Sequence, residues 1–152
     1  MRFTVPGKAQ PKKRPRVVRT PKGVHTYTPD ELGYVPQVQA RALEAGVKVL
    51  DGPVYLSMLI HRRMPAGFSR KKRIEMEGKL TIVRPDPINV AMLYCDALSG
   101  IAWHDDSQVH LRFVEQRWAT VDEVLVDVTS PNGESPREHI DSQAEAAQKA
   151  WD

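Results

Sequence analysis

An apolar run that begins at Pro87 limits most strongly what this chain can fold into. The run, PINVAMLYCDAL, directly follows Asp86 and ends at Ser99-Gly100. Because Asp is a favoured helix N-cap and Pro a favoured first helical residue, the pattern predicts a central helix of about three turns. The longer segment from Arg84 to Val109 carries four aspartates, and no Lys or Arg follows Arg84 within it. One apolar helix therefore lies inside an acidic segment.

The segments around this helix are predicted to be mainly strands. Alternating and β-branched residues predict strands in RFTVPG, VHTYT, GPVYLSMLIHRR, VHLRFVEQRW and TVDEVLVDVT. In the fourth of these, Val109, Leu111 and Phe113 are expected on one face. Helical spacing predicts flanking helices over about 36–45 and 69–77. Prolines oppose a helix in residues 8–23, which are predicted to form a basic loop.

This order predicts an α+β domain, a small mixed β-sheet with a central helix and flanking helices. The length of 152 residues favours one domain over 1–130, and residues 131–152 are predicted to be a linker followed by a helix with a thin apolar face. No apolar run approaches the roughly 20 residues that span a membrane. The N-terminus lacks the apolar core of a signal peptide, and the single cysteine, Cys95, cannot form an internal disulfide or a cysteine-based zinc site. We therefore expect a cytoplasmic protein.

Positive charge is concentrated in two blocks of the chain. Residues 1–28 hold eight Lys and Arg and no acidic residue, and residues 61–84 hold eight against two glutamates. Ordinary surfaces mix both signs, so the blocks favour a polyanionic partner, most often nucleic acid. The alternative is a solvated surface that binds nothing specific. The candidate phosphate contacts are Lys12, Lys13, Arg14, Arg16, Arg70, Lys71, Lys72 and Arg73.

The aspartates between the two blocks support two interpretations. Asp86 can simply cap the helix, with Asn89 orienting its carboxylate, and Asp105-Asp106-Ser107 is ordinary turn sequence. Alternatively, Asp86 and one of the paired aspartates converge on Mg²⁺, which prefers carboxylate oxygen and keeps several waters. Such an ion can activate water for phosphodiester hydrolysis. Asp96 lies near the helix C-terminus, where the dipole disfavours a carboxylate, so it needs a donor, a cation or exposure.

Four other features can be interpreted as structural or as functional. His104 can act as a base or a metal ligand, although a residue in such a position is more often a polar surface group. Trp103 is expected in the core or at an interface, and Cys95 is expected to be a small buried helix residue. Residues on the apolar side of the central helix can pack within one subunit or contribute to a dimer core. These residues are Val90, Leu93 and Tyr94.

Two separated motifs resemble the RusA family of Holliday-junction resolvases. The segment RPDPINVAMLYCDALSGIAWHDDSQV resembles the central pattern of the family, roughly Pro-Asp-x-Asp-Asn, a helix, Asp-Ala-Leu, a short apolar stretch and Asp-Asp-x-x-Val. The stretch FTVPGKAQPKKRPR, followed by HTYTPDE, is similar to the opening strand, basic loop and TYTP element of the family. The resemblance covers roughly residues 2–118.

The resemblance implies a small homodimeric endonuclease that uses Mg²⁺, with Mn²⁺ as a substitute, and cuts four-way or branched DNA during recombination and repair. It places the metal-binding carboxylates on Asp86 and Asp106, with Asp105 as a further catalytic position. It also implies supporting roles for Asn89 and Asp96. Because the family is common in phages and prophages, the implied setting is a bacterial or phage-infected cell.

The sequence departs from the family pattern at two positions. Ile88 replaces the second aspartate, and Met92 replaces a lysine that commonly precedes Asp-Ala-Leu. The first change removes a ligand, so Mg²⁺ affinity should fall, and the second removes a cation that could stabilise the transition state. Two alternatives to an active nuclease follow. The chain could bind junctions while cutting them weakly or not at all, or it could be a basic structural protein.

Overall fold

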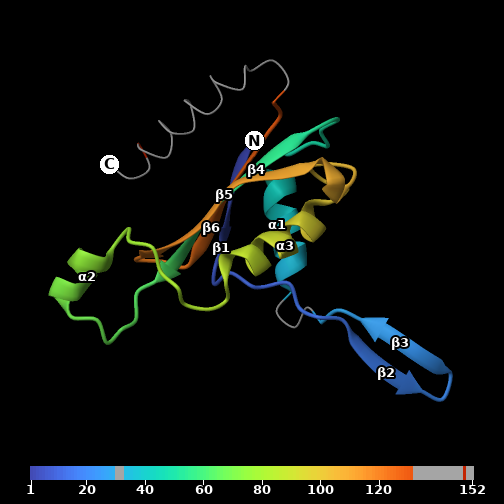
Figure 1. Cartoon of the computed structure of the whole chain (residues 1–152), viewed down its shortest axis with the longest axis horizontal. Coiled ribbons are helices and arrows are strands. Elements are labelled where there is room, and N and C mark those ends of the chain that lie inside the picture. The colour runs from blue at the N-terminus through green and yellow to red at the C-terminus, as the bar shows by residue number, and fades with distance from the viewer. Residues whose placement is uncertain (30–32, 132–148, 150–152) are drawn as a thin grey trace.

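A four-stranded mixed sheet forms the centre of the chain. The computed structural model describes residues 1–29, 33–131 and 149. Its strands are β1 (Arg2–Pro6), β4 (Val54–Arg63), β5 (Val109–Ala119) and β6 (Glu123–Thr129). They lie in the order β1-β6-β4-β5 (Figure 1). β4 and β5 are parallel, whereas β6 is antiparallel to both of its neighbours, so the predicted mixed sheet is confirmed.

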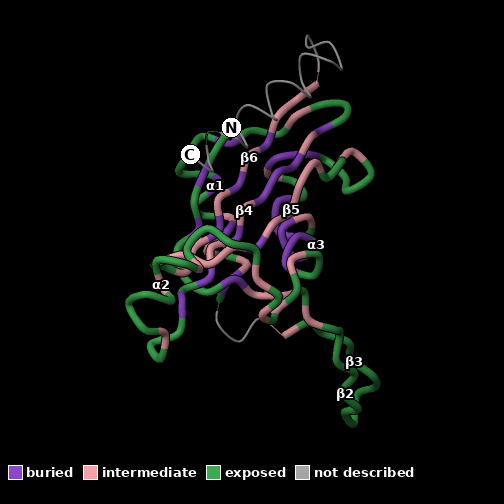
Figure 2. The backbone as a smooth tube through the Cα atoms, turned by 60° about the vertical axis from the view of Figure 1, so that its left-hand side comes forward, coloured by how far each residue is buried: buried purple, intermediate pink, exposed green. Residues whose placement is uncertain are grey.

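Two helices, α1 (Tyr34–Glu44) and α3 (Pro87–Leu98), cover one face of the sheet (Figure 1). The core includes Leu56 and Val126 of the sheet and the buried residues of both helices. Figure 2 shows buried segments concentrated in these elements. The hydroxyl groups of Tyr34 and Tyr94 lie 2.6 Å apart and join α1 to α3 within this core. The predicted α+β architecture with a central helix is therefore confirmed.

A basic helix and a two-stranded ribbon lie outside the core. The helix α2 (Arg70–Met76) confirms the helix predicted over about 69–77, and it begins after Ser69, whose hydroxyl accepts a hydrogen bond from the Lys72 backbone N–H. The ribbon consists of β2 (Arg16–Thr20) and β3 (Gly23–Tyr27), which pair antiparallel with each other. Figures 1 and 2 show both elements projecting from the body as exposed segments.

The prediction of a basic loop over residues 8–23 is wrong, because β2 forms within it. Pro15 and Pro21 flank the strand Arg16–Thr20 and do not interrupt it. A proline removes a backbone N–H donor only at its own position, so prolines on either side leave the ladder of β2 intact. The predicted strand VHTYT corresponds to β3 and is confirmed.

Other boundaries differ by a few residues for local reasons. α1 begins at Tyr34, two residues earlier than predicted, because Pro36 then falls in the first turn, where a backbone N–H has no helical partner. In β5, Leu111 pairs with Leu56 while Phe113 pairs with Ser57, so Arg112 is an extra residue in the strand. This bulge breaks the simple alternation predicted for Leu111 and Phe113.

The predicted linker and helix over 131–152 fall outside the described residues, except for Pro131 and Lys149. In the part of the chain that the structure describes, no helix has both the length and the apolar character needed to span a membrane.

Candidate metal site and nucleic-acid interface

Asp86 is fixed in place at the start of α3. Its backbone is extended, and its carboxylate Oδ1 accepts a 2.9 Å hydrogen bond from the Asn89 backbone N–H. The Asn89 side-chain Nδ2 donates a second hydrogen bond of 2.9 Å to Oδ2. Asp86 is therefore the predicted cap, and Asn89 orients it as predicted. Each carboxylate oxygen retains a further lone pair, so capping does not prevent Asp86 from binding a cation.

The two adjacent aspartates before β5 have different environments. Asp105 caps a short 3₁₀ turn, and its Oδ1 accepts a 2.8 Å hydrogen bond from the Ser107 backbone N–H. The hydrogen bonds from Ser107 lower the pKa of Asp105. Asp106 is exposed, and its side-chain carboxylate accepts no hydrogen bond from the residues that the structure describes, whereas its backbone carbonyl accepts one from the Val109 N–H. Of the pair, Asp106 is therefore the one whose carboxylate is available to a ligand.

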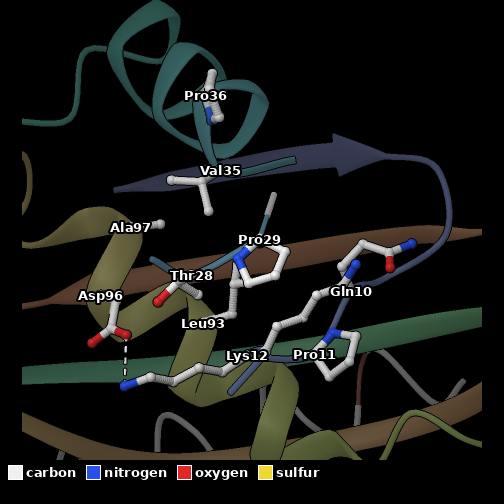
Figure 3. A pocket seen from close by; sticks show the side chains of 11 residues that line it. Gln10, Pro11, Lys12, Thr28, Pro29, Val35, Pro36, Leu93, Asp96 and Ala97 are labelled. Carbon is white, nitrogen blue, oxygen red and sulfur yellow. Dashed lines mark ion pairs between the residues drawn. The ribbon is translucent and has the colours of Figure 1, made fainter. Parts of the chain in front are cut away.

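Lys12 links the basic segment after β1 to α3 through two contacts. Its backbone N–H donates a 3.0 Å hydrogen bond to the Asn89 carbonyl, and its Nζ lies 2.7 Å from Asp96 Oδ2 (Figure 3). The hydrogen bond and charge of Asp96 raise the pKa of Lys12, and the charge of Asp106 raises it further against a small opposing effect of burial. The cation required by Asp96 is therefore Lys12, a residue that the sequence assigned to DNA phosphates.

A cavity of about 420 Å³ lies beside this ion pair. Figure 3 shows the Lys12 side chain reaching along it to Asp96, with Pro29, Val35 and Leu93 on the other walls. The cavity is lined by residues from the base of the ribbon, from α1 and from α3. Its lining is mainly apolar, so Lys12 and Asp96 face each other at the edge of an apolar recess.

Asp86 and Asp96 lie at different positions along α3. The charge of Asp106 raises the pKa of Cys95. With a rise of about 1.5 Å per residue, Asp86 and Asp96 are roughly 15 Å apart along the axis. Asp96 therefore cannot share one ion with Asp86. Among residues 1–29, 33–131 and 149, no group of three or more His, Cys, Asp and Glu is arranged to hold a metal ion.

The two departures from the family pattern lie on the solvent face of α3. Ile88 is 66% exposed and Met92 is 46% exposed, although both are apolar. Neither side chain can bind a cation or donate to a phosphate. The face of α3 between Asp86 and Asp96 is consequently less polar than the acidic segment suggests.

Most of the remaining candidate residues have structural environments: they are buried or half-buried, or they pair with a surface residue. Trp103, Val90 and Tyr94 are fully buried and Leu93 is 8% exposed, so the helix residues considered for a dimer core pack within one chain. Cys95 is half-buried, and burial raises the pKa of its thiol to about 11, so it stays protonated at neutral pH. The His104 Nε2 lies 2.9 Å from Asp51 Oδ1, and both side chains are exposed, as expected for a polar surface group.

The basic residues of α2 are not equivalent. Arg70, Lys71 and Lys72 are exposed, and Lys72 Nζ lies 4.3 Å from the centre of the Phe68 ring. Arg73 is half-buried, and its guanidinium donates hydrogen bonds to the backbone oxygens of Pro65 and Phe68. Arg73 therefore supports the loop before α2, and the exposed cations are better placed for a polyanion.

Sequence reasoning missed Arg62 and Gln116, which hold the segment leading into Asp86. Arg62 is only 6% exposed, and its Nη2 donates a 2.9 Å hydrogen bond to the Arg84 carbonyl. The Gln116 side chain donates to the Val83 carbonyl at 2.6 Å. The available signal was the alternation of Met58, Ile60 and Arg62 on the buried side of β4.

Comparison with known proteins identifies one family. A sequence model of the family described as Endodeoxyribonuclease RusA matches residues 6–129. No curated protein matches the chain. The matched region contains every predicted metal, supporting and phosphate-contact residue, including the ribbon and α2.

Proposed function

Because this chain belongs to the RusA family of endodeoxyribonucleases, we propose that it is a structure-selective endonuclease that cuts Holliday junctions and related branched DNA. The family match over residues 6–129 carries the proposal. Proteins of this family generally depend on a divalent metal and bind branched DNA. The reaction is hydrolysis of phosphodiester bonds during recombination and repair, in a bacterial or phage-infected cell.

Asp86 and Asp106 are the residues that would hold Mg²⁺, with Mn²⁺ as a substitute. Both carry hard carboxylate oxygens, Asp86 keeps lone pairs beyond its two hydrogen bonds, and Asp106 is exposed. This donor chemistry fits an ion that keeps most of its waters. When bound, the ion supplies a nucleophilic water and stabilises charge on the phosphate oxygens.

The protein positions these groups before DNA binds. Asn89 holds both oxygens of Asp86 through two donors, which fixes the rotamer of the carboxylate. Asp105 is a positioning residue, because its capping of the 3₁₀ turn sets the backbone of Asp106. Lys12 remains protonated beside Asp96, so it adds a cation at the edge of the acidic segment.

The basic segments supply affinity for the DNA backbone. Phosphate contacts give binding that weakens steeply with salt and depends little on base sequence. A four-way junction has two-fold symmetry, so paired cuts require two sites related by a two-fold axis. A homodimer is therefore part of the proposal.

A second candidate is a junction-binding protein with little or no cleavage. The observation that favours it is the exposure of the apolar side chains of Ile88 and Met92 on α3, the helix that Asp86 caps. These apolar side chains lie where a ligand and a cation would strengthen catalysis. Binding through the basic segments does not require either group.

The two candidates differ in one assay. Labelled four-way junction is incubated with the protein in Mg²⁺, in Mn²⁺ or in chelator. Metal-dependent paired nicks, lost in Asp86→Asn and Asp106→Asn, support the endonuclease. A retarded but intact junction in every condition supports the binding protein, and equal affinity for junction and linear duplex contradicts both.

A further inference from the structure

The β2–β3 ribbon is built as a separate element. Its strands pair only with each other in the sheet topology, and all of their residues are exposed. Figure 1 shows the ribbon projecting away from the sheet and both covering helices. An isolated two-stranded hairpin is marginally stable in water, so a partner that orders it is expected.

The ribbon exposes apolar and basic side chains together. Val17 is 65% exposed, Val24 is 62% exposed and Tyr27 is 49% exposed. The chain has no acidic residue before Asp30, while Arg16, Arg19 and Lys22 lie within or at the tip of the ribbon. A polyanion complements this charge, and the apolar groups gain from being covered.

The pairing register places this mixture on both faces. Arg16 pairs with Tyr27 and Val18 with His25, so these four side chains share one face. Arg19 pairs with Val24 and Val17 with Thr26 on the opposite face. A flat partner would cover only one face, whereas a groove with two negatively charged walls would cover both.

We propose that the β2–β3 ribbon enters a groove of a duplex arm of branched DNA, with its basic side chains against the phosphates of the two groove walls. The major groove of DNA is wide enough to admit a two-stranded β-ribbon. The proposed contacts of these basic side chains are to the phosphate backbone, which carries no base-sequence information. The identity of the partner as DNA rests on the proposed function.

Two variants separate the ribbon from the rest of the fold. In the first, residues 17–26 are replaced by Asn-Gly, which joins the paired residues Arg16 and Tyr27 by a two-residue hairpin turn. No residue from 16 to 27 is buried, so the body should fold as before. In the second, Arg19→Gln and Lys22→Gln remove two charges and leave the ribbon in place. The control, Arg41→Gln with Lys48→Gln, removes two exposed charges on or beyond α1.

Affinity for a fluorescent four-way junction is measured in chelator over a series of salt concentrations, so that cleavage plays no part. Each lost phosphate contact reduces the slope of log affinity against log salt by about 0.9. The variant with Arg19→Gln and Lys22→Gln lacks two basic side chains, so we expect the magnitude of its slope to be smaller by about 2. The shortened ribbon should bind at least about tenfold more weakly, and the control should match the unmodified protein.

Unchanged affinity and slope in both ribbon variants would overturn the inference. A shortened ribbon that changes the oligomeric state in sedimentation, while the charge variant binds normally, would identify a second copy of the chain as the partner and would also overturn it. Failure of the unmodified protein to cut junctions would contradict the proposed nuclease alone, because the binding measurements do not depend on cleavage.

Discussion

The Nζ of Lys12 lies 2.7 Å from Oδ2 of Asp96, which joins the N-terminal basic segment to the second half of α3. The same lysine is also held by its backbone N–H, which donates to the Asn89 carbonyl. The chain therefore balances the one acidic residue within α3 with a basic residue from the segment after β1. The remaining cations of the segment extend from this anchor toward the ribbon.

Breaking the Lys12–Asp96 pair should change the free energy of unfolding only slightly. Both side chains are partly exposed, at 40% and 47%, and such pairs contribute about 0–1 kcal/mol. A double-mutant cycle with Lys12→Met and Asp96→Asn, measured by urea unfolding, should give a coupling free energy below about 1 kcal/mol. The backbone hydrogen bond to Asn89 remains in both variants.

The pH dependence of this coupling follows from the raised pKa of Lys12. A raised pKa in the folded state means that the contribution is complete below the ordinary value of 10.5 and is lost as the pH rises through the folded value. The coupling should therefore be constant from pH 6 to 9. A coupling that disappears within that range would contradict the charge assignment of Lys12.

The Cys95 thiol should report on the charge of Asp106. Its pKa is raised to about 11, first by burial and then by the negative charges of Asp106 and Asp96. Reaction with a disulfide reagent should therefore be slow at pH 8 and should accelerate in Asp106→Asn, because a lower pKa gives more thiolate. Asp105→Asn is the matched control, and an equal acceleration in both variants would place Asp106 away from α3.

Asp105 should be replaceable by asparagine and not by alanine. Asparagine can still accept the hydrogen bond from Ser107 and cap the 3₁₀ turn, whereas alanine cannot. Asp105→Ala should weaken Mg²⁺ binding by loosening the backbone of Asp106, and Asp105→Asn should bind Mg²⁺ nearly as well as the unmodified protein. Calorimetric titration with Mg²⁺ measures this. Equal loss in both variants would make Asp105 itself a ligand.

Ile88→Asp should strengthen the metal site without harming the fold. The position is 66% exposed at the start of α3, where a carboxylate also interacts favourably with the helix dipole. We expect about tenfold tighter Mg²⁺ binding, equivalent to about 1.4 kcal/mol. Ile88→Asn provides a control of similar size without charge. No gain from Asp over Asn would show that residue 88 does not face the ion.

The sequence was sufficient for the elements with strong local signals. The central helix has a cap, a proline at its first position and a stop at Ser99-Gly100, and α3 forms between these signals. β4 has a largely apolar sequence up to Ile60, β6 is rich in β-branched residues, and both strands lie in the middle of the sheet. α3 positions Asp86, and the 3₁₀ turn before β5 carries Asp106, while the binding of one ion by both carboxylates stays a prediction.

The missed features depend on tertiary contacts. β2 is stabilised by pairing with β3. The prolines of residues 8–23 argue against regular structure there, but Pro15 and Pro21 lie just outside the strand. Arg62 resembled a surface charge beside Arg63, yet the Arg84 carbonyl holds it inside the fold. The pairing of Lys12 with Asp96 joins residues far apart in the chain, and no local pattern encodes it.

The position of one ion relative to two carboxylates tests the account most directly. A crystal soaked in Mn²⁺, located by its anomalous scattering, should show oxygens of Asp86 and Asp106 about 2.1 Å from a common ion. An ion held by other residues, or carboxylates separated by more than about 10 Å, would contradict the account, because neither arrangement allows the two aspartates to share a cation.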